Sequence, residues 1–170
     1  MDIFIKNREQ YKQESDQLSS KYNQVSVLRI TSFILAMVAI IYFANGKNAV
    51  AIALVSVGFV VTFGLLIKWH NRIKYGRNHA QFLQQINEEE LERLDGNLVG
   101  FDEGEEFKSA DHHYANDLDI FGRNSVFQLV NRTTTPAGRN MLADWLLHPA
   151  ARENILLRQE AVAELKEDIK

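Results

Sequence analysis

Three consecutive stretches decide the fold: ITSFILAMVAIIYFA (residues 30–44), NGKN (45–48) and AVAIALVSVGFVVTFGLLI (49–67). Neither apolar run contains a charged side chain, and only the short polar stretch separates them. At about 1.5 Å per residue, a helix over residues 49–67 covers roughly 28 Å, which is close to the hydrocarbon thickness of a bilayer. The sequence therefore predicts a transmembrane helical hairpin over residues 30–67, with a tight turn at its centre.

The first run is the shorter one, since residues 30–44 cover only about 22 Å as a helix. An extension back to residue 25 includes Arg29, whose long side chain can reach the headgroups. The predicted spans are therefore about 25–44 and 49–67. A soluble hairpin buried in a helical bundle is an alternative, but residues 49–67 are apolar on every side and leave no face for water. A cleaved signal peptide fits less well, because the first run begins late and a second follows at once.

Basic residues set the predicted orientation. They precede the hairpin at Lys6, Arg8, Lys12, Lys21 and Arg29, and they follow it at Lys68, Arg72, Lys74 and Arg77. The turn carries only Lys47. Because basic residues favour the cytoplasmic side, both termini are predicted in the cytoplasm and the turn outside.

The segments on either side of the hairpin have helical patterns. In residues 1–29 one apolar seam consists of Phe4, Tyr11, Leu18, Tyr22 and Val25. In residues 68–95 the apolar positions are Ile73, Ala80, Leu83, Ile86, Leu91 and Leu94. These seams predict two juxtamembrane helices that pack together in antiparallel fashion. Two independent, solvated helices are the alternative.

Composition excludes some classes of function. The chain has 170 residues, a formal net charge of −3 and no cysteine. Disulfides and thiolate metal sites are therefore excluded, and the charge does not favour a generally nucleic-acid-binding surface.

An acidic stretch follows the second helical segment. Residues 88–106 contain nine carboxylates and one basic residue, Arg93, and they are interrupted by Gly96, Gly100 and Gly104. Carboxylates do acid–base chemistry only where a pocket separates their pKa values, and a glycine-rich solvated run offers none. Residues 96–110 are therefore predicted to form an acidic linker.

Residues 111–170 have the sequence pattern of a compact helical region. Residues 118–121 predict a short extended segment that ends in a turn at Gly122, and residues 125–130 predict a short helix. A threonine cap followed by Pro136 predicts the start of a longer helix, which Pro149 ends.

Two helices are predicted in this last part of the chain. The predicted buried face of the first helix consists of Met141, Leu142, Trp145 and Leu146. A second helix is predicted from Arg152, with Ile155, Gln159, Val162, Leu165 and Ile169 in register. It reaches Lys170 with no terminating signal, so we expect the chain to be the N-terminal part of a longer protein.

One extended pattern is shared with a known family. It consists of Ser125-x-Phe127-x-Leu129-x-Asn131-x-Thr133-x-Thr135-x-x-Gly138-Arg139-x-Met141-Leu142-x-x-Trp145-Leu146-x-x-Pro149, followed by Ile155-x-x-Arg158-Gln159-x-Ala161-Val162. This pattern resembles the opening of the core (lever) domain of the MutS family, the DNA mismatch repair ATPases. Asn124 stands where the family usually has glycine. The hairpin stands where MutS proteins carry mismatch-reading and connector domains, so the chain is similar to the membrane-anchored MutS-related proteins of bacteria.

The resemblance implies a structural role for the motif residues. In the family this opening segment links the clamp helices to the ATPase. Thr133 or Thr135 would then cap a helix, Gly138 would allow a close helix approach, and Trp145 and Leu146 would lie in the core. Ser125, Phe127, Asn131 and Pro149 complete the structural motif.

The resemblance also implies DNA binding, ATP hydrolysis with Mg²⁺ and a homodimer for the full-length protein. The chain itself contains no Gly-x-x-x-x-Gly-Lys-Ser/Thr phosphate loop, so we expect no ATP hydrolysis by this chain alone. No catalytic, cofactor-binding or metal-binding residue is assigned within it.

Two further sets of residues are candidate sites. The cluster of Asp111, His112, His113, Asp117 and Asp119 lacks a metal-ligand spacing, which favours an ordinary polar loop. Arg123, Arg132 and Arg139 belong to a local basic excess and are candidates for weak phosphate contacts.

Together these patterns predict a mainly α protein whose hairpin ties a MutS-like core segment to the bacterial inner membrane. The alternative is a non-enzymatic membrane-anchored adaptor with a helical stalk, in which the MutS-like segment only packs.

Overall fold

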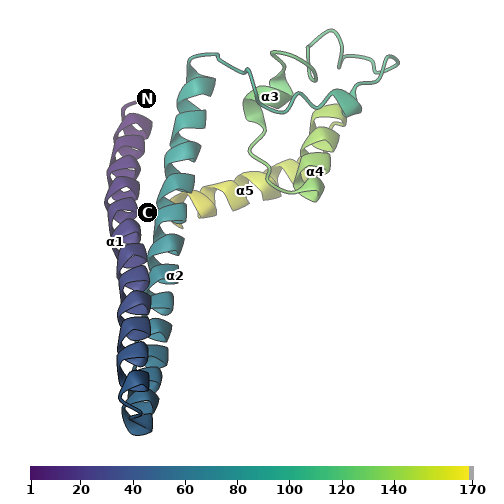
Figure 1. Ribbon diagram of the computed structural model, residues 1–170. Coiled ribbons are helices and arrows are strands. Elements are labelled where there is room, and N and C mark those ends of the chain that lie inside the picture. The colour runs from purple at the N-terminus through teal and green to yellow at the C-terminus, as the bar shows by residue number, and fades with distance from the viewer. Residues whose placement is uncertain (169–170) are drawn as a thin grey trace. The chain divides into compact units, whose positions relative to one another are not determined.

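The computed structural model describes residues 1–168, and every regular element in that range is helical, with no strand. The elements are α1 (Asp2–Asn45), α2 (Ala49–Leu94), the 3₁₀ helix η1 (Glu105–Phe107), α3 (Val126–Val130), α4 (Pro136–Leu147) and α5 (Arg152–Asp168), as labelled in Figure 1. The chain divides into one compact unit at Met1–Asp95 and a second that begins at Gly96. The mainly α fold is as predicted.

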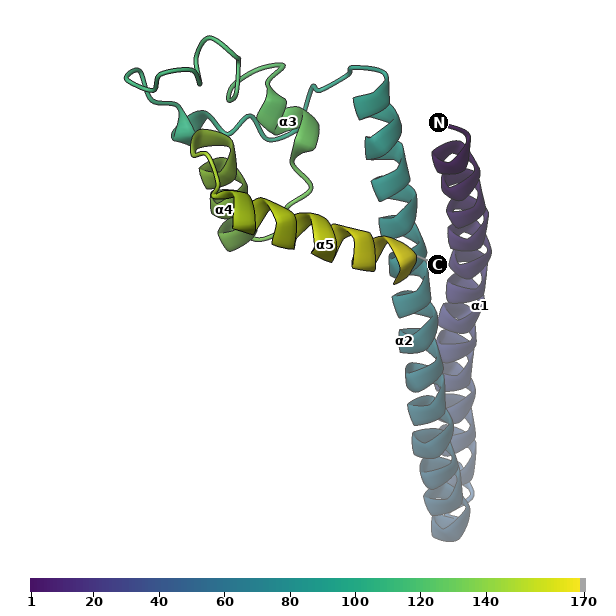
Figure 2. The ribbon, with the colours of Figure 1, turned by 180° about the vertical axis from the view of Figure 1, so that it is seen from behind.

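The first unit is an antiparallel pair of long helices. Figures 1 and 2 show α1 and α2 side by side along their length, with the turn at one end. Each predicted span and its juxtamembrane segment form one continuous helix. At the turn the Lys47 N–H donates to the Ala44 carbonyl at 3.0 Å. Asn48 then caps α2, because its Oδ1 accepts the Ala51 N–H at 3.1 Å.

The seam between α1 and α2 follows the predicted seven-residue spacing. Val25 is 2% exposed, and Ala80 is 1% exposed on the facing helix. Gly76 lies against Leu18 of the other helix, since a Cβ there would be in ordinary contact with Leu18 Cδ1 at 3.4 Å. The prediction of two paired helices is therefore correct within this unit. Ile86 and Leu94 differ from the prediction, because both are at least half exposed rather than part of the seam.

Beyond the seam, the apolar side chains of residues 30–67 face outward. Leu35 and Leu54 are 64% and 69% exposed, and no residue of the most apolar window of either helix is buried. The polar side chains in the first run bond to their own helix: Thr31 Oγ1 donates to the Val27 carbonyl at 2.9 Å, and Ser32 Oγ donates to the Arg29 carbonyl at 2.8 Å. By length and composition both helices could cross a membrane.

The second unit has a small aromatic core. Its buried residues are Ala115, Ile120, Phe121, Phe127 and Ala143. Phe107 joins them, and the rings of Phe107, Phe121 and Phe127 lie with centroids 5.4 to 5.8 Å apart. Leu142, Leu146 and Leu147 pack against this cluster from α4. Residues far apart in the sequence therefore meet in one core.

The loop before α3 differs from the sequence prediction. Residues 118–121 were expected to be extended, but the chain turns here: the Leu118 N–H donates to the Tyr114 carbonyl, and Asp119 has a φ of +47°. This turn allows the Phe127 N–H to donate to the Ile120 carbonyl at 2.9 Å. The turn thus brings the start of α3 against the core.

The predicted buried face of α4 is right for Leu142 and Leu146 and wrong for Met141 and Trp145. Ala143 and the leucines around it form the face, whereas Met141 is 56% exposed and Trp145 is 45% exposed. The helical spacing alone fitted either stripe, and the position of the phenylalanine cluster selects one. In α5, Ile155, Val162 and Leu165 are on an exposed helix, and Ile169 and Lys170 lie outside the described residues.

Candidate functional site

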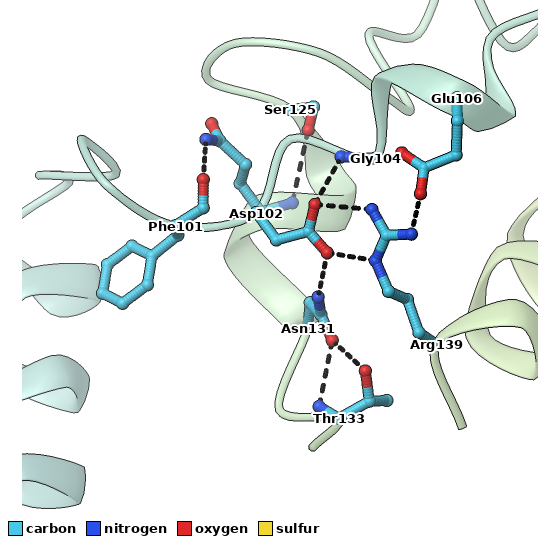
Figure 3. Close-up of polar contacts among 9 residues, drawn as sticks. Phe101, Asp102, Gly104, Glu106, Ser125, Asn131, Thr133 and Arg139 are labelled. Atoms are coloured by element: carbon cyan, nitrogen blue, oxygen red, sulfur yellow. Dashed lines mark hydrogen bonds and ion pairs between the residues drawn. The ribbon is translucent and has the colours of Figure 1, made fainter. Parts of the chain in front are cut away.

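The conspicuous polar arrangement of the second unit is centred on Asp102, which we call the Asp102 junction (Figure 3). Its carboxylate Oδ1 accepts the Gly104 N–H at 3.0 Å and the Arg139 Nη2–H at 2.7 Å. Its Oδ2 accepts from Arg139 Nε and, at 3.4 Å, from Asn131 Nδ2. One carboxylate thus joins the segment before η1, the end of α3 and the start of α4.

Arg139 is the cationic partner. Its guanidinium binds Asp102 through two nitrogens, and its Nη1 also pairs with Glu106. The group lies 4.9 Å from the centroid of the Phe107 ring. The hydrogen bond from Arg139 lowers the pKa of Asp102 and raises that of Arg139 itself. Both groups therefore hold their charges more firmly than isolated side chains do.

The residues after α3 explain why the predicted motif has its spacing. Asn131 Oδ1 accepts both the backbone N–H of Thr133 at 2.9 Å and its hydroxyl at 2.7 Å. Two residues later Thr135 is the N-cap of α4, with its Oγ1 accepting the Gly138 N–H at 3.2 Å. A Cβ on Gly138 would lie 3.2 Å from that Oγ1. The glycine thus makes room for the threonine cap rather than for another helix.

Gln128 of α3 also holds the incoming chain. Its Nε2 donates to the carbonyls of Phe101 at 2.8 Å and Leu98 at 3.3 Å, and its Oε1 accepts the Asn124 N–H at 2.7 Å. Gln128 is 2% exposed, so these bonds satisfy a buried amide. Ser125 positions it by capping α3 through the Gln128 N–H.

Gly104 is required at its position. It has a φ of +62°, and a Cβ there would lie 2.9 Å from Phe127 Cδ1 and 3.0 Å from Phe121 Cδ1. Residues 96–107, which the sequence predicts as part of a linker, thus supply several contacts of the junction.

The three arginines considered for phosphate contacts lie in different settings. Arg123 is exposed, Arg132 donates to the Leu129 carbonyl, and Arg139 is held by two carboxylates. The structure therefore does not gather them into one cationic cluster, and a phosphate at Arg139 would compete with Asp102 and Glu106. The predicted contacts stay a prediction.

Other motif residues lie outside the junction. Trp145 holds the Arg158 guanidinium 3.8 Å from its ring centroid, which ties α4 to α5. α4 ends at Leu147, two residues before Pro149.

Within the described residues, the histidine loop does not form a metal site. His112 is held by the backbone, with Nε2 3.0 Å from the Leu147 carbonyl and Nδ1 accepting the Ala115 N–H at 3.2 Å. Among residues 1–168 no group of three or more potential ligands could hold a metal ion.

Chemically, the junction holds three backbone segments in position through hydrogen bonds and ion pairs. Its titratable groups are locked in opposite charges, which suits structural linkage rather than proton transfer. Sequence reasoning missed Asp102 and Gln128. The available signals were an Asp placed two residues before Gly104 in the acidic run, and a Gln inside an apolar helix.

Comparisons with known proteins agree with this C-terminal location. Residues 106–170 match the family model described as MutS domain III. The chain is also similar to DNA mismatch repair protein MSH6 of Saccharomyces cerevisiae, with 39% identity over 57 residues. That alignment covers 33% of this chain and 5% of the yeast protein, so the chain spans a small part of this relative. No solved structure matches. The comparisons support a MutS-related, mismatch-repair-like segment from about residue 106 onward.

Proposed function

We propose that this chain anchors a MutS-related protein to the cytoplasmic face of the bacterial inner membrane. One observation carries the proposal: a segment similar to MutS domain III follows, in the same chain, a hairpin that turns its apolar side chains outward. A soluble protein seldom exposes so large an apolar surface, whereas a bilayer favours it.

The orientation with both termini in the cytoplasm rests on the basic residues beside both spans. In this arrangement residues 68–94 of α2 and the first part of α1 form a stalk that carries the second unit. The Asp102 junction then holds the segment before η1, which follows the stalk in sequence, to α3 and α4 of the MutS-like segment.

We further propose that the full-length protein binds DNA, hydrolyses ATP with Mg²⁺ and acts as a homodimer, with the ATP site outside this chain. The similarity to MutS domain III and to a DNA mismatch repair protein supports this proposal.

The membrane anchor is tested by topology labelling, for which the cysteine-free chain is well suited. We expect Lys47→Cys to react with an impermeant maleimide in intact spheroplasts. Gln13→Cys should react only after the membrane is opened. Labelling of Gln13→Cys in sealed cells would refute the cytoplasmic orientation of the termini. Recovery of the chain in the soluble fraction after alkaline washing would refute the anchor.

The MutS-like activity is tested on the full-length protein. We expect ATP hydrolysis that DNA stimulates and that is lost when the phosphate-loop lysine is changed. A full-length protein with no such hydrolysis would instead support the adaptor function.

A further inference from the structure

The hairpin contains a long stretch without carboxylates. No Asp or Glu lies between Asp16 and Glu88, whereas that stretch contains seven basic residues. They are Lys21, Arg29, Lys47, Lys68, Arg72, Lys74 and Arg77. Arg29 stands thirteen residues from the nearest carboxylate in sequence, so no acidic side chain lies on its own part of the helix, and an anion from outside the chain can balance its charge where it is shielded from water.

Arg29 is the basic residue nearest the apolar spans. Its guanidinium lies 5.5 Å from the centroid of the Phe63 ring, and its Nε is buried without a hydrogen-bond partner. An unpaired polar atom in such a place is costly, so the position favours an acceptor that the protein itself does not supply.

A groove with two chemically different ends begins at this arginine. It has a volume of about 320 Å³ and is lined by Ser26, Arg29, Ile30, Phe33 and Phe63. Ser26 and Arg29 make one end polar, while the other three side chains make the continuation apolar. From Ser26 to Phe33 the lining advances about 10 Å along α1. An elongated molecule with an anionic head and a hydrocarbon tail matches this order.

The stalk beside the groove carries further positive charge. His70 is 8% exposed and its ring centroid lies 4.3 Å from that of Tyr22. The pKa of His70 is lowered, first by burial and then by Arg29, Lys74 and Arg77. The same positive field that disfavours protonation of His70 attracts an anion.

We propose that the groove at Arg29 binds one anionic phospholipid of the cytoplasmic leaflet, with its headgroup phosphate on the guanidinium and an acyl chain along Ile30, Phe33 and Phe63. This inference rests on the proposed membrane anchor. The phosphate is an anionic acceptor for the Arg29 guanidinium, and basic pockets at the cytoplasmic end of membrane helices suit such headgroups. A free phosphate would leave the apolar part of the groove without a ligand.

The test is native mass spectrometry of the full chain released from nanodiscs made of equal parts phosphatidylglycerol and phosphatidylcholine. We expect the wild type to retain one phosphatidylglycerol in preference to phosphatidylcholine. Arg29→Gln should weaken that retention about fivefold, the effect of one basic residue near an anionic surface. Arg29→Lys should keep most of the preference. Arg8→Gln is the matched control, because Arg8 lies on the same helix and pairs with Glu9 at 2.8 Å.

Equal retention of the two lipids by the wild type, or unchanged preference in Arg29→Gln with wild-type helicity, would overturn the lipid site. Displacement of the bound species by inorganic phosphate would also overturn it, in favour of a free-anion site. In both cases the chain would still sit in the nanodisc, so the membrane anchor would stand. A chain that fails to enter nanodiscs at all would overturn both proposals.

Discussion

The hairpin of residues 1–95 and the unit that begins at Gly96 bury their apolar side chains in opposite ways. In the hairpin, Val25 and Ala80 are enclosed in a narrow seam while Leu54 is 69% exposed. In the second unit Phe127 is fully enclosed by residues from distant parts of the chain. An apolar solvent would stabilise the outside of the first arrangement, as the proposed membrane anchor requires, whereas the second excludes water by itself. On that proposal, one chain is suited to two solvents.

The largest expected effect comes from the aromatic core. Phe127→Ala should destabilise the second unit by about 3–5 kcal/mol, because it removes a ring that is 0% exposed. Chemical denaturation followed by Trp145 fluorescence, with Trp69→Phe in every variant compared, measures this loss. Leu129→Ala, at a 45% exposed position in the same helix, should cost far less. Equal losses in the two variants would mean that the second unit has no water-excluding core.

A charge placed on the outward face of the hairpin tests whether that face contacts lipid. Leu54→Arg should disfavour membrane insertion by about 3 kcal/mol if the residue faces lipid. In a water-exposed position the same change would be nearly neutral. Membrane fractionation measures the effect, and Ile86→Arg, in the half-exposed stalk, is the control. Normal insertion of Leu54→Arg would break the two-solvent comparison.

A glycine pair separates backbone strain from packing. Gly104 and Gly96 have φ values of +62° and +74°, but only Gly104 faces phenylalanine rings. Both alanine variants share the strain of about 1–2 kcal/mol. Gly104→Ala should lose about 1–3 kcal/mol more from overpacking. Thermal unfolding of the two variants gives the difference, and a difference near zero would place residue 104 outside the core.

The smallest effect concerns acid stability. The pKa of Asp102 is lowered below its ordinary value of 3.8, so its stabilising contribution is complete above that value and is lost as the pH falls through the lower, folded-state value. Asp102→Asn should remove this acid-dependent part, about 1 kcal/mol or less because the Asp102 side chain is 38% exposed. Denaturation from pH 7 to pH 2 measures it. The hairpin should not respond to this substitution.

The two regions also differ in how far sequence predicts them. Continuous apolar runs and a seven-residue seam predicted the hairpin, because both depend on local periodicity. The Thr135-Pro136 pair likewise predicted the start of α4. The Asp102 junction was not predicted, because Asp102 and Arg139 are distant in sequence. The acidic run around Asp102 also has the composition of a solvent-exposed linker.

The buried faces and turns of the short elements were also harder to predict, because they depend on residues distant in sequence. Trp145 shares a helical face with Leu142 in sequence, yet only the placement of Phe107, Phe121 and Phe127 decides which stripe of α4 is covered. The turn at residues 114–119 depends on hydrogen bonds to α3 that no local pattern reveals.

The continuity of α1 and α2 has a mechanical consequence. Neither helix breaks where the proposed bilayer would end, so each acts as one rod. Residues 68–94 extend roughly 40 Å beyond the span, and a tilt of about 20° would displace the far end by roughly 14 Å. Bilayers of different thickness change helix tilt. The thickness of the membrane would thus set the position of the far end of the stalk.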